Sequence, residues 1–245
     1  MSGIDIEAAH EEVLAALRAI GNPRRGEAVQ RDRGSALQHL GIGFPALRAR
    51  VKQGFSFSTQ PAGEVLAAWD ALWQRSPVGD VLFAALVHHE PVVRKQVPPG
   101  LWPVLRGWHA RVDNWCHADM LAGLYSRLLQ ARFDEVYPQL QAWNAAPGEW
   151  QRRLSITSLV HYTGKNAVFL PPAPMLPLLT ACVDDPRPSV QMALGWVLRE
   201  LGRVHPHEAA AFLRQHGPRM SAKARARAGV AGSFTASQSA TSPST

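Results

Sequence analysis

The sequence has few of the residues that build covalent or metal-held frameworks, since only two of its 245 residues are cysteines, Cys116 and Cys182. Two cysteines cannot form a disulfide framework or a four-cysteine zinc site. No uncharged apolar run reaches the ~18 residues that a membrane span requires, so we expect no membrane partner. The stretch 1–12 carries four carboxylates and lacks the basic-then-apolar order of a secretory signal. We therefore expect a cytoplasmic protein in a reducing compartment.

Several catalytic and ligand-binding signatures are also missing. The chain has no Gly-x-Ser-x-Gly, no phosphate-cradling glycine loop and no His-Glu-x-x-His. The pairs His88–His89 and Cys116–His117 are too close in sequence for ordinary zinc ligation, and no complementary pair follows them. His117 is also unable to activate Cys116 as a nucleophile, because neighbours on a helix do not face each other. The sequence predicts no metal site and no cofactor.

Positive charge is in excess, and nearly all of it is arginine. Lys plus Arg total 26 against 19 Asp plus Glu, a formal charge of +7, and only four of the 26 are Lys. Arg presents phosphate with a planar fork of donors, so the excess favours a nucleic-acid partner. An Arg-rich codon bias would give the same count, so charge alone leaves the partner open.

Apolar residues recur with a helical period along nearly the whole chain. The clearest stripe is formed by Leu121, Leu124, Tyr125, Leu128 and Leu129. No segment shows the alternation of a half-buried strand. A short helix is expected to open at 43–45. The pattern predicts further helices over 6–20, 27–40, 62–74, 78–89, 118–131, 133–143, 149–161, 174–183, 189–201 and 207–216.

About a dozen short helices punctuated by proline and glycine predict an all-α protein. Antiparallel helix pairs stacked as a HEAT-like α-solenoid are one arrangement, and a compact irregular bundle is the other; periodicity alone does not choose between them. We place one domain at 1–228. Residues 229–245 carry no charge and are mostly Ser, Thr, Ala and Gly, so we expect them to form a disordered tail.

Two side chains within or at the start of a helix expected near residues 116–131 are suited to a cationic ligand. Trp115 and Asp119 are four residues apart, so both can face one groove. A carboxylate supplies negative charge, and an indole supplies the negative face of its ring. The alternative is structural, because an Asp in a first helical turn is a routine dipole partner and a Trp often belongs to the core.

Two further segments carry candidate binding residues. Arg152 and Arg153 point about 100° apart on a helix, so at most one shares the face of Trp150 while the other projects outward as a phosphate ligand or an ordinary solvated charge. Gly195 lies inside a predicted helix, where close contact with another helix would explain it. Its neighbour Trp196 is either core or an exposed platform.

Four segments in this order resemble the AlkD-type DNA alkylation repair family of HEAT-like DNA glycosylases. They span residues 40 to 200, and the last is the most specific. The segments are 40–48 (LGIGFPALR), 112–119 (VDNWCHAD), 150–153 (WQRR) and 193–200 (ALGWVLRE).

The resemblance implies an α-solenoid with a basic concave face that cradles duplex DNA containing alkylated bases, acting as a monomer. It implies hydrolysis of the N-glycosidic bond of cationic N3- and N7-alkylpurines. Asp119 matches the catalytic Asp, and Trp115 and Trp196 match the aromatic pair that flanks the deoxyribose of the lesion. Arg153 is the preferred match to the Arg that holds the DNA backbone, with Arg152 as the other choice.

Two positions depart from the family pattern. Cys116 stands where the family often has Asp, and no Tyr or Trp lies between Gly26 and Leu40, where some members place an aromatic. These departures keep two alternatives to a glycosylase open. One is a DNA-binding solenoid without excision activity, whose affinity would fall steeply with salt. The other is a protein–protein scaffold.

Overall fold

The computed structural model describes residues 3–95, 97–161 and 167–229, and within these ranges the chain forms thirteen α-helices, three short 3-10 helices and no strand. Apart from Gly229, the predicted tail lies outside the described residues. The 3-10 helices are η1 (Ser56–Thr59), η2 (Arg106–Arg111) and η3 (Gly217–Arg219). The α-helices are α1 (Ile6–Arg18), α2 (Pro23–Arg33), α3 (Phe44–Lys52), α4 (Ala62–Arg75), α5 (Gly79–Lys95), α6 (Leu101–Leu105), α7 (Trp115–Ala131), α8 (Phe133–Asn144), α9 (Glu149–Thr157), α10 (Pro172–Thr180), α11 (Pro188–Val204), α12 (Pro206–His216) and α13 (Ala222–Arg227).

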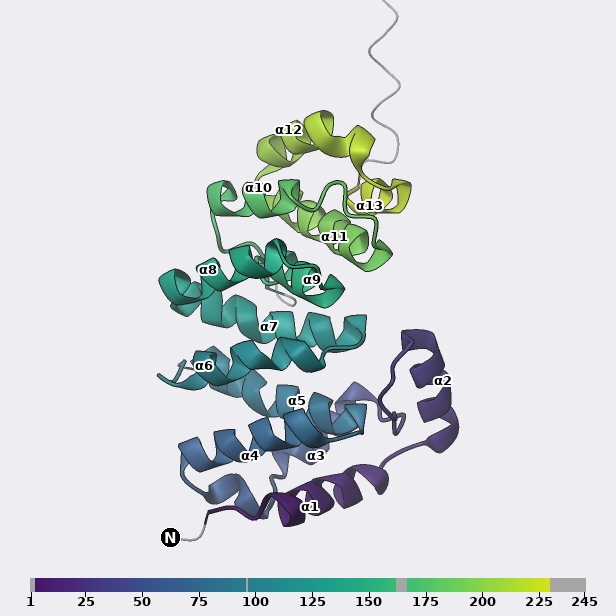
Figure 1. The fold of residues 1–245 in the computed structure, drawn as a ribbon, viewed down its shortest axis with the longest axis vertical. Helices are drawn as coiled ribbons and strands as arrows, with labels where there is room; N and C mark the ends of the chain where they lie inside the picture. The colour runs from purple at the N-terminus through teal and green to yellow at the C-terminus, as the bar shows by residue number, and fades with distance from the viewer. Residues whose placement is uncertain (1–2, 96, 162–166, 230–245) are drawn as a thin grey trace, which may run out of the picture.

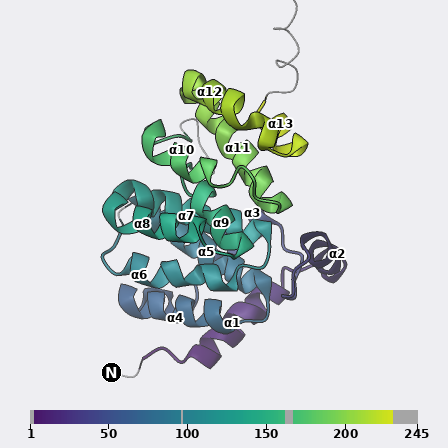
Figure 2. The same ribbon diagram turned by 45° about the horizontal axis from the view of Figure 1, so that its top comes forward.

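The helices stack along the long axis of the molecule (Figure 1). One row runs through α3, α5, α7, α9, α11 and α13, each packed against the next. A second row covers it, with α4 against α5, α8 against α7 and α9, and α12 against α11. In both views α2 stands off from the stack, toward the side on which α13 lies (Figures 1 and 2). This arrangement confirms the predicted all-α solenoid and excludes the irregular bundle.

The prediction of a helix over 27–40 is wrong at both ends. The helix begins at Pro23, because the side chain of Asn22 caps it by accepting from the backbone N–H of Arg25. It ends at Gly34, whose positive φ of 59° is the left-handed conformation that favours glycine. The segment after it folds back on α2 so closely that a Cβ at Gly26 would lie 2.1 Å from a backbone oxygen.

Other boundaries also differ from the periodic pattern. α5 continues through Pro91 to Lys95, because buried Val93 beyond the proline holds the last turn against the core. α7 begins at Trp115, three residues before the predicted start, and α9 ends at Thr157, four residues before the predicted end. The pattern missed α6 and α13 altogether, because five or six residues are too few to show a helical period.

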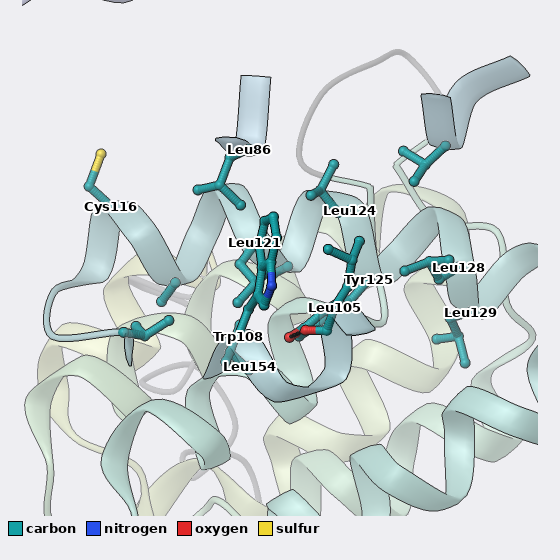
Figure 3. Packing of buried hydrophobic residues seen from close by; sticks show 14 of the residues in the cluster. Leu86, Leu105, Trp108, Cys116, Leu121, Leu124, Tyr125, Leu128, Leu129 and Leu154 are labelled. Carbon is teal, nitrogen blue, oxygen red and sulfur yellow. Dashed lines mark hydrogen bonds between the residues drawn. The ribbon is translucent and has the colours of Figure 1, made fainter. Parts of the chain in front are cut away.

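A continuous apolar core joins the two rows and fixes α7. Trp73 and Trp108 stack with ring centroids 4.4 Å apart, and the indole N–H of Trp73 donates to the backbone oxygen of Trp108 over 3.0 Å. Figure 3 shows Trp108 beside Leu121 and Tyr125 of α7. All four of these side chains are fully buried. The same helix carries Trp115 and Asp119, so the core packing positions these candidate residues.

Gly195 is the point at which α13 touches α11. A Cβ at Gly195 would lie 2.4 Å from the backbone oxygen of Ala224, which cannot move without displacing α13. We expect Gly195→Ala to cost about 1–3 kcal/mol of stability, as overpacking does, measured by denaturant unfolding. Gly202→Ala on the same helix is the matched control, since its Cβ would meet ordinary contacts at 3.5 Å. An unchanged free energy of unfolding for Gly195→Ala would contradict this account.

Buried histidines make the fold sensitive to acid. Burial lowers the pKa of His88 to about 4, and burial together with His88 lowers the pKa of His89 to about 3. Because the unfolded histidines titrate near pH 6.5, the unfolded state binds more protons between pH 6.5 and 4, and stability falls as pH falls through that window. We expect His88→Gln to flatten this loss by at most about 1.4 kcal/mol per pH unit, measured by urea unfolding at several pH values. His207→Gln, at an exposed position, should leave the profile unchanged.

Candidate functional site

A cleft of about 630 Å³ lies where the successive inner helices α7, α9, α11 and α13 meet. Four of the residues predicted from the sequence line it: Trp115 and Asp119 from α7, Arg153 from α9 and Trp196 from α11. The rest of the lining is supplied by Trp150, Pro188, Ser189, Met192, Arg199 and Arg227. The cleft therefore combines one carboxylate with three indoles and three guanidinium groups.

Asp119, in the lining of this cleft, is held by a two-pronged ion pair with Arg153. The Asp119 side chain is 9 % exposed, and its carboxylate accepts from Nε of Arg153 over 2.9 Å and from Nη2 over 3.0 Å. The third nitrogen of Arg153 donates to the backbone oxygen of Ser189 over 2.5 Å, so the Arg153 side chain also ties α9 to α11. The pair joins residues 34 positions apart and fixes the carboxylate in one orientation.

Burial and the facing guanidinium act on Asp119 in opposite directions. Burial raises the pKa of Asp119 above its ordinary value, and the Arg153 ion pair opposes this rise, with a smaller contribution from Arg227. A carboxylate has about four lone-pair positions, and Arg153 occupies only those on one side. No other described residue donates a hydrogen bond to this carboxylate, which leaves lone pairs for a water molecule or for positive charge in the cleft.

The start of α7 is fixed by a capping network that orients Trp115 and Asp119. The buried side chain of Asn114 accepts from the backbone N–H groups of Cys116 and His117, at 3.0 and 3.1 Å. Its amide donates to Asp113, which in turn accepts from the hydroxyl of Ser35 over 2.7 Å. Burial alone would raise the pKa of Asp113, but hydrogen bonds with His117, Ser35 and Asn114 hold that pKa well below its usual range.

Asp119 is not in the first turn of α7, because the helix begins at Trp115. The reading of Asp119 as a partner of the helix dipole therefore fails, since the dipole acts mainly within the first turn. Trp115, at the first helical position, is 43 % exposed and does not belong to the core. Trp150 and Trp196 are partly buried and pack against the core.

Arg152 lies outside the cleft and serves the fold. Its three guanidinium nitrogens donate over 2.6 Å each to Asp185 and to the backbone oxygens of Asn144 and Ala181. Both members of the arginine pair thus have protein partners, so the expectation that one projects freely outward is wrong. The DNA contact suggested for Arg152 or Arg153 stays a prediction, and Arg153 is the one in the cleft.

Six lining residues were not among the predicted site residues, and three of these, Trp150, Arg199 and Arg227, add an indole and two charges to the cleft. Trp150 shares a helix face with Arg153 at a spacing of three residues, which was a usable signal. Arg199 is held by Glu200, with 2.9 Å between Nη2 and the carboxylate. Arg227 had no signal, because its helix α13 was missed.

The described residues offer little to other kinds of chemistry. Burial raises the pKa of the Cys116 thiol to about 11, so the thiolate is scarce at neutral pH. Across residues 3–95, 97–161 and 167–229, no three His, Cys, Asp or Glu side chains come together as a metal-binding group. In the same ranges no helix is both long and apolar enough to cross a membrane.

Comparison with known proteins places the fold and the family. No curated protein matches the sequence. A predicted DNA alkylation repair enzyme from Enterococcus faecalis superposes with a TM-score of 0.68 at 16 % identity, covering 88 % of this chain and 97 % of that one. AlkD2 from Streptococcus mutans superposes with a TM-score of 0.55 at 15 % identity, covering 87 % and 99 %. Residues 13–229 match the family described as DNA alkylation repair enzyme. The chain therefore belongs to this family, as its four sequence segments predicted, and family membership supports a role in DNA repair.

Proposed function

We propose that this protein is a DNA glycosylase that hydrolyses the N-glycosidic bond of cationic N3- and N7-alkylpurines in duplex DNA. The observation that carries the proposal is the buried carboxylate of Asp119, oriented by Arg153 and opening into a cleft lined by Trp115, Trp150 and Trp196. A fixed negative charge beside indole faces is suited to a ligand that carries positive charge.

The chemistry needs no acid to activate the leaving group. An N3- or N7-alkylated purine already carries positive charge, and it departs with the electron pair of the bond to C1′, which leaves the base neutral. Positive charge then develops on the sugar as an oxocarbenium ion. Water bonds to C1′, and its proton passes to Asp119 and on to solvent. The products are the free alkylpurine and an abasic sugar.

Asp119 supports both halves of this reaction. Its negative charge stabilises the oxocarbenium ion, and its free lone pairs orient and deprotonate the attacking water. Because Arg153 already fixes the carboxylate, little reorganisation is needed as charge develops. The indoles add cation–π attraction of about 0.5–2 kcal/mol each where they are desolvated.

The cleft also contains an aromatic that was not among the site residues predicted from the sequence. The segment between Gly26 and Leu40 contains no Tyr or Trp, and no residue of α2 lines the cleft. Trp150 enters the cleft from α9 as a third indole beside Trp115 and Trp196. We assign to Trp150 the role of a further wall against the lesion-bearing nucleotide.

The test is release of free base from methylated duplex DNA by the purified full-length chain. We expect 7-methylguanine or 3-methyladenine in the supernatant and no release of unmodified purines. Duplex binding that weakens with salt, without base release, would replace the proposal with a non-catalytic DNA-binding solenoid. Absent or salt-insensitive DNA binding would instead favour a protein–protein scaffold.

A further inference from the structure

A second cavity adjoins the cleft on the other side of Asp119. It has a volume of about 280 Å³ and lies between α3, α5 and α7, with Asp119 in the wall that it shares with the cleft. Its apolar lining includes Phe44, Val93 and Met120. The cavity is thus contiguous with the candidate catalytic carboxylate, and nothing in the proposed reaction uses it.

The charges in this cavity do not balance. Two carboxylates line it, and each has its own arginine: Glu90 is bound by Arg48, with 2.7 Å between Oε1 and Nη2, and Asp119 is bound by Arg153. His161 is neutral at pH 7, because burial and Arg127 lower its pKa to about 4. This leaves two further arginines, Arg94 and Arg127, in the lining.

Arg94 and Arg127 line the same cavity, and no described residue supplies either of them with a counter-ion. Among the residues that the structure describes, neither guanidinium makes a hydrogen bond or an ion pair. Burial and the charge of Arg94 both lower the pKa of Arg127, so the two groups are close enough to repel each other. Like charges held together cost free energy, so this pair does not stabilise the fold.

We infer that Arg94 and Arg127 form a phosphate-binding site, which holds the backbone phosphodiester next to the nucleotide that faces Asp119. The inference rests on the proposed function in one respect, namely that duplex DNA lies against Asp119. A sugar placed at Asp119 carries a phosphodiester on each side, and one of these falls beside a cavity that shares the Asp119 wall. Two guanidinium groups present several donors to such an anion, and apolar walls strengthen the attraction.

The double variant Arg94→Gln/Arg127→Gln tests this site through binding to undamaged duplex DNA. We expect the affinity to fall by about tenfold or more and the slope of log Kd against log salt to shrink by about one, as loss of one phosphate contact requires. The matched control is Arg106→Gln/Arg214→Gln, which removes the same charge from exposed positions on η2 and α12. The control should keep the wild-type slope.

A single neutral methylphosphonate in the duplex identifies the phosphate. It should weaken binding by wild-type protein at one position and have little further effect on the double variant. The double variant should keep the wild-type Tm, because it removes two like charges that repel each other. Arg94→Gln alone, at an exposed position, is a second variant, for which we expect a smaller loss of affinity for duplex DNA.

Several outcomes separate this inference from the proposed glycosylase activity. An unchanged salt slope in the double variant would overturn the phosphate site even if base release is observed. Reduced slope without any base release would keep the site and overturn the glycosylase. Competition by inorganic phosphate that depends on Arg94 and Arg127, with an unchanged duplex slope, would identify a site for free phosphate and also overturn the inference.

Discussion

Asp119→Asn is expected to lower the single-turnover rate of alkylpurine release by about 10²–10³-fold, as loss of a preorganised electrostatic group does. Asn keeps the shape and one acceptor oxygen, but it carries no charge to stabilise the oxocarbenium ion and cannot take a proton from water. Duplex affinity should change little, because the variant loses a negative charge and keeps every arginine. The measurement is base release under enzyme excess from methylated duplex DNA.

A surface carboxylate provides the matched control for this substitution. Asp184 also pairs with an arginine, Arg219, but both side chains are more than half exposed. Asp184→Asn should leave the rate of base release unchanged, since Asp184 lies outside the cleft. Release by Asp119→Asn at the wild-type rate would remove Asp119 from the chemistry.

Arg153→Met is expected to cost about 3–5 kcal/mol of stability, because it leaves the buried Asp119 carboxylate without its counter-ion. The substitution also removes the bond to the Ser189 backbone that joins α9 to α11. Urea unfolding measures the loss. Arg219→Met, in the exposed pair with Asp184, should change Tm little, because solvent screens that pair.

The double variant Asp119→Asn/Arg153→Met separates charge from packing. It should recover part of the stability lost by Arg153→Met, because no unpaired charge then remains buried. Additive losses in the two single variants would show that the ion pair is not the dominant interaction. The same double variant should release no base.

Local spacing determined much of the candidate site. Trp115 and Asp119 at four residues, and Trp150 and Arg153 at three, share helix faces for reasons that hold in any α-helix. The all-α class followed equally from the helical period of the apolar residues. The helical period did not predict the short helices. Because α13 was among them, Arg227, which lines the cleft, was not predicted either.

Tertiary structure decided the partners of the two adjacent arginines. The sequence left open which of them meets DNA, and their rotation on the helix sends Arg153 to Asp119 and Arg152 to Asp185. Contacts between residues more than 30 positions apart depend on how the helices stack, which no local pattern encodes. The sequence by itself determined the all-helical class, through the helical period of its apolar residues, and the family, through its four segments. Only the packing of α7 against α9 and α11 placed one carboxylate in a buried ion pair. Only the packing of α5 against α7 brought Arg94 and Arg127 to one cavity, where no residue in 3–95, 97–161 or 167–229 supplies them with a counter-ion.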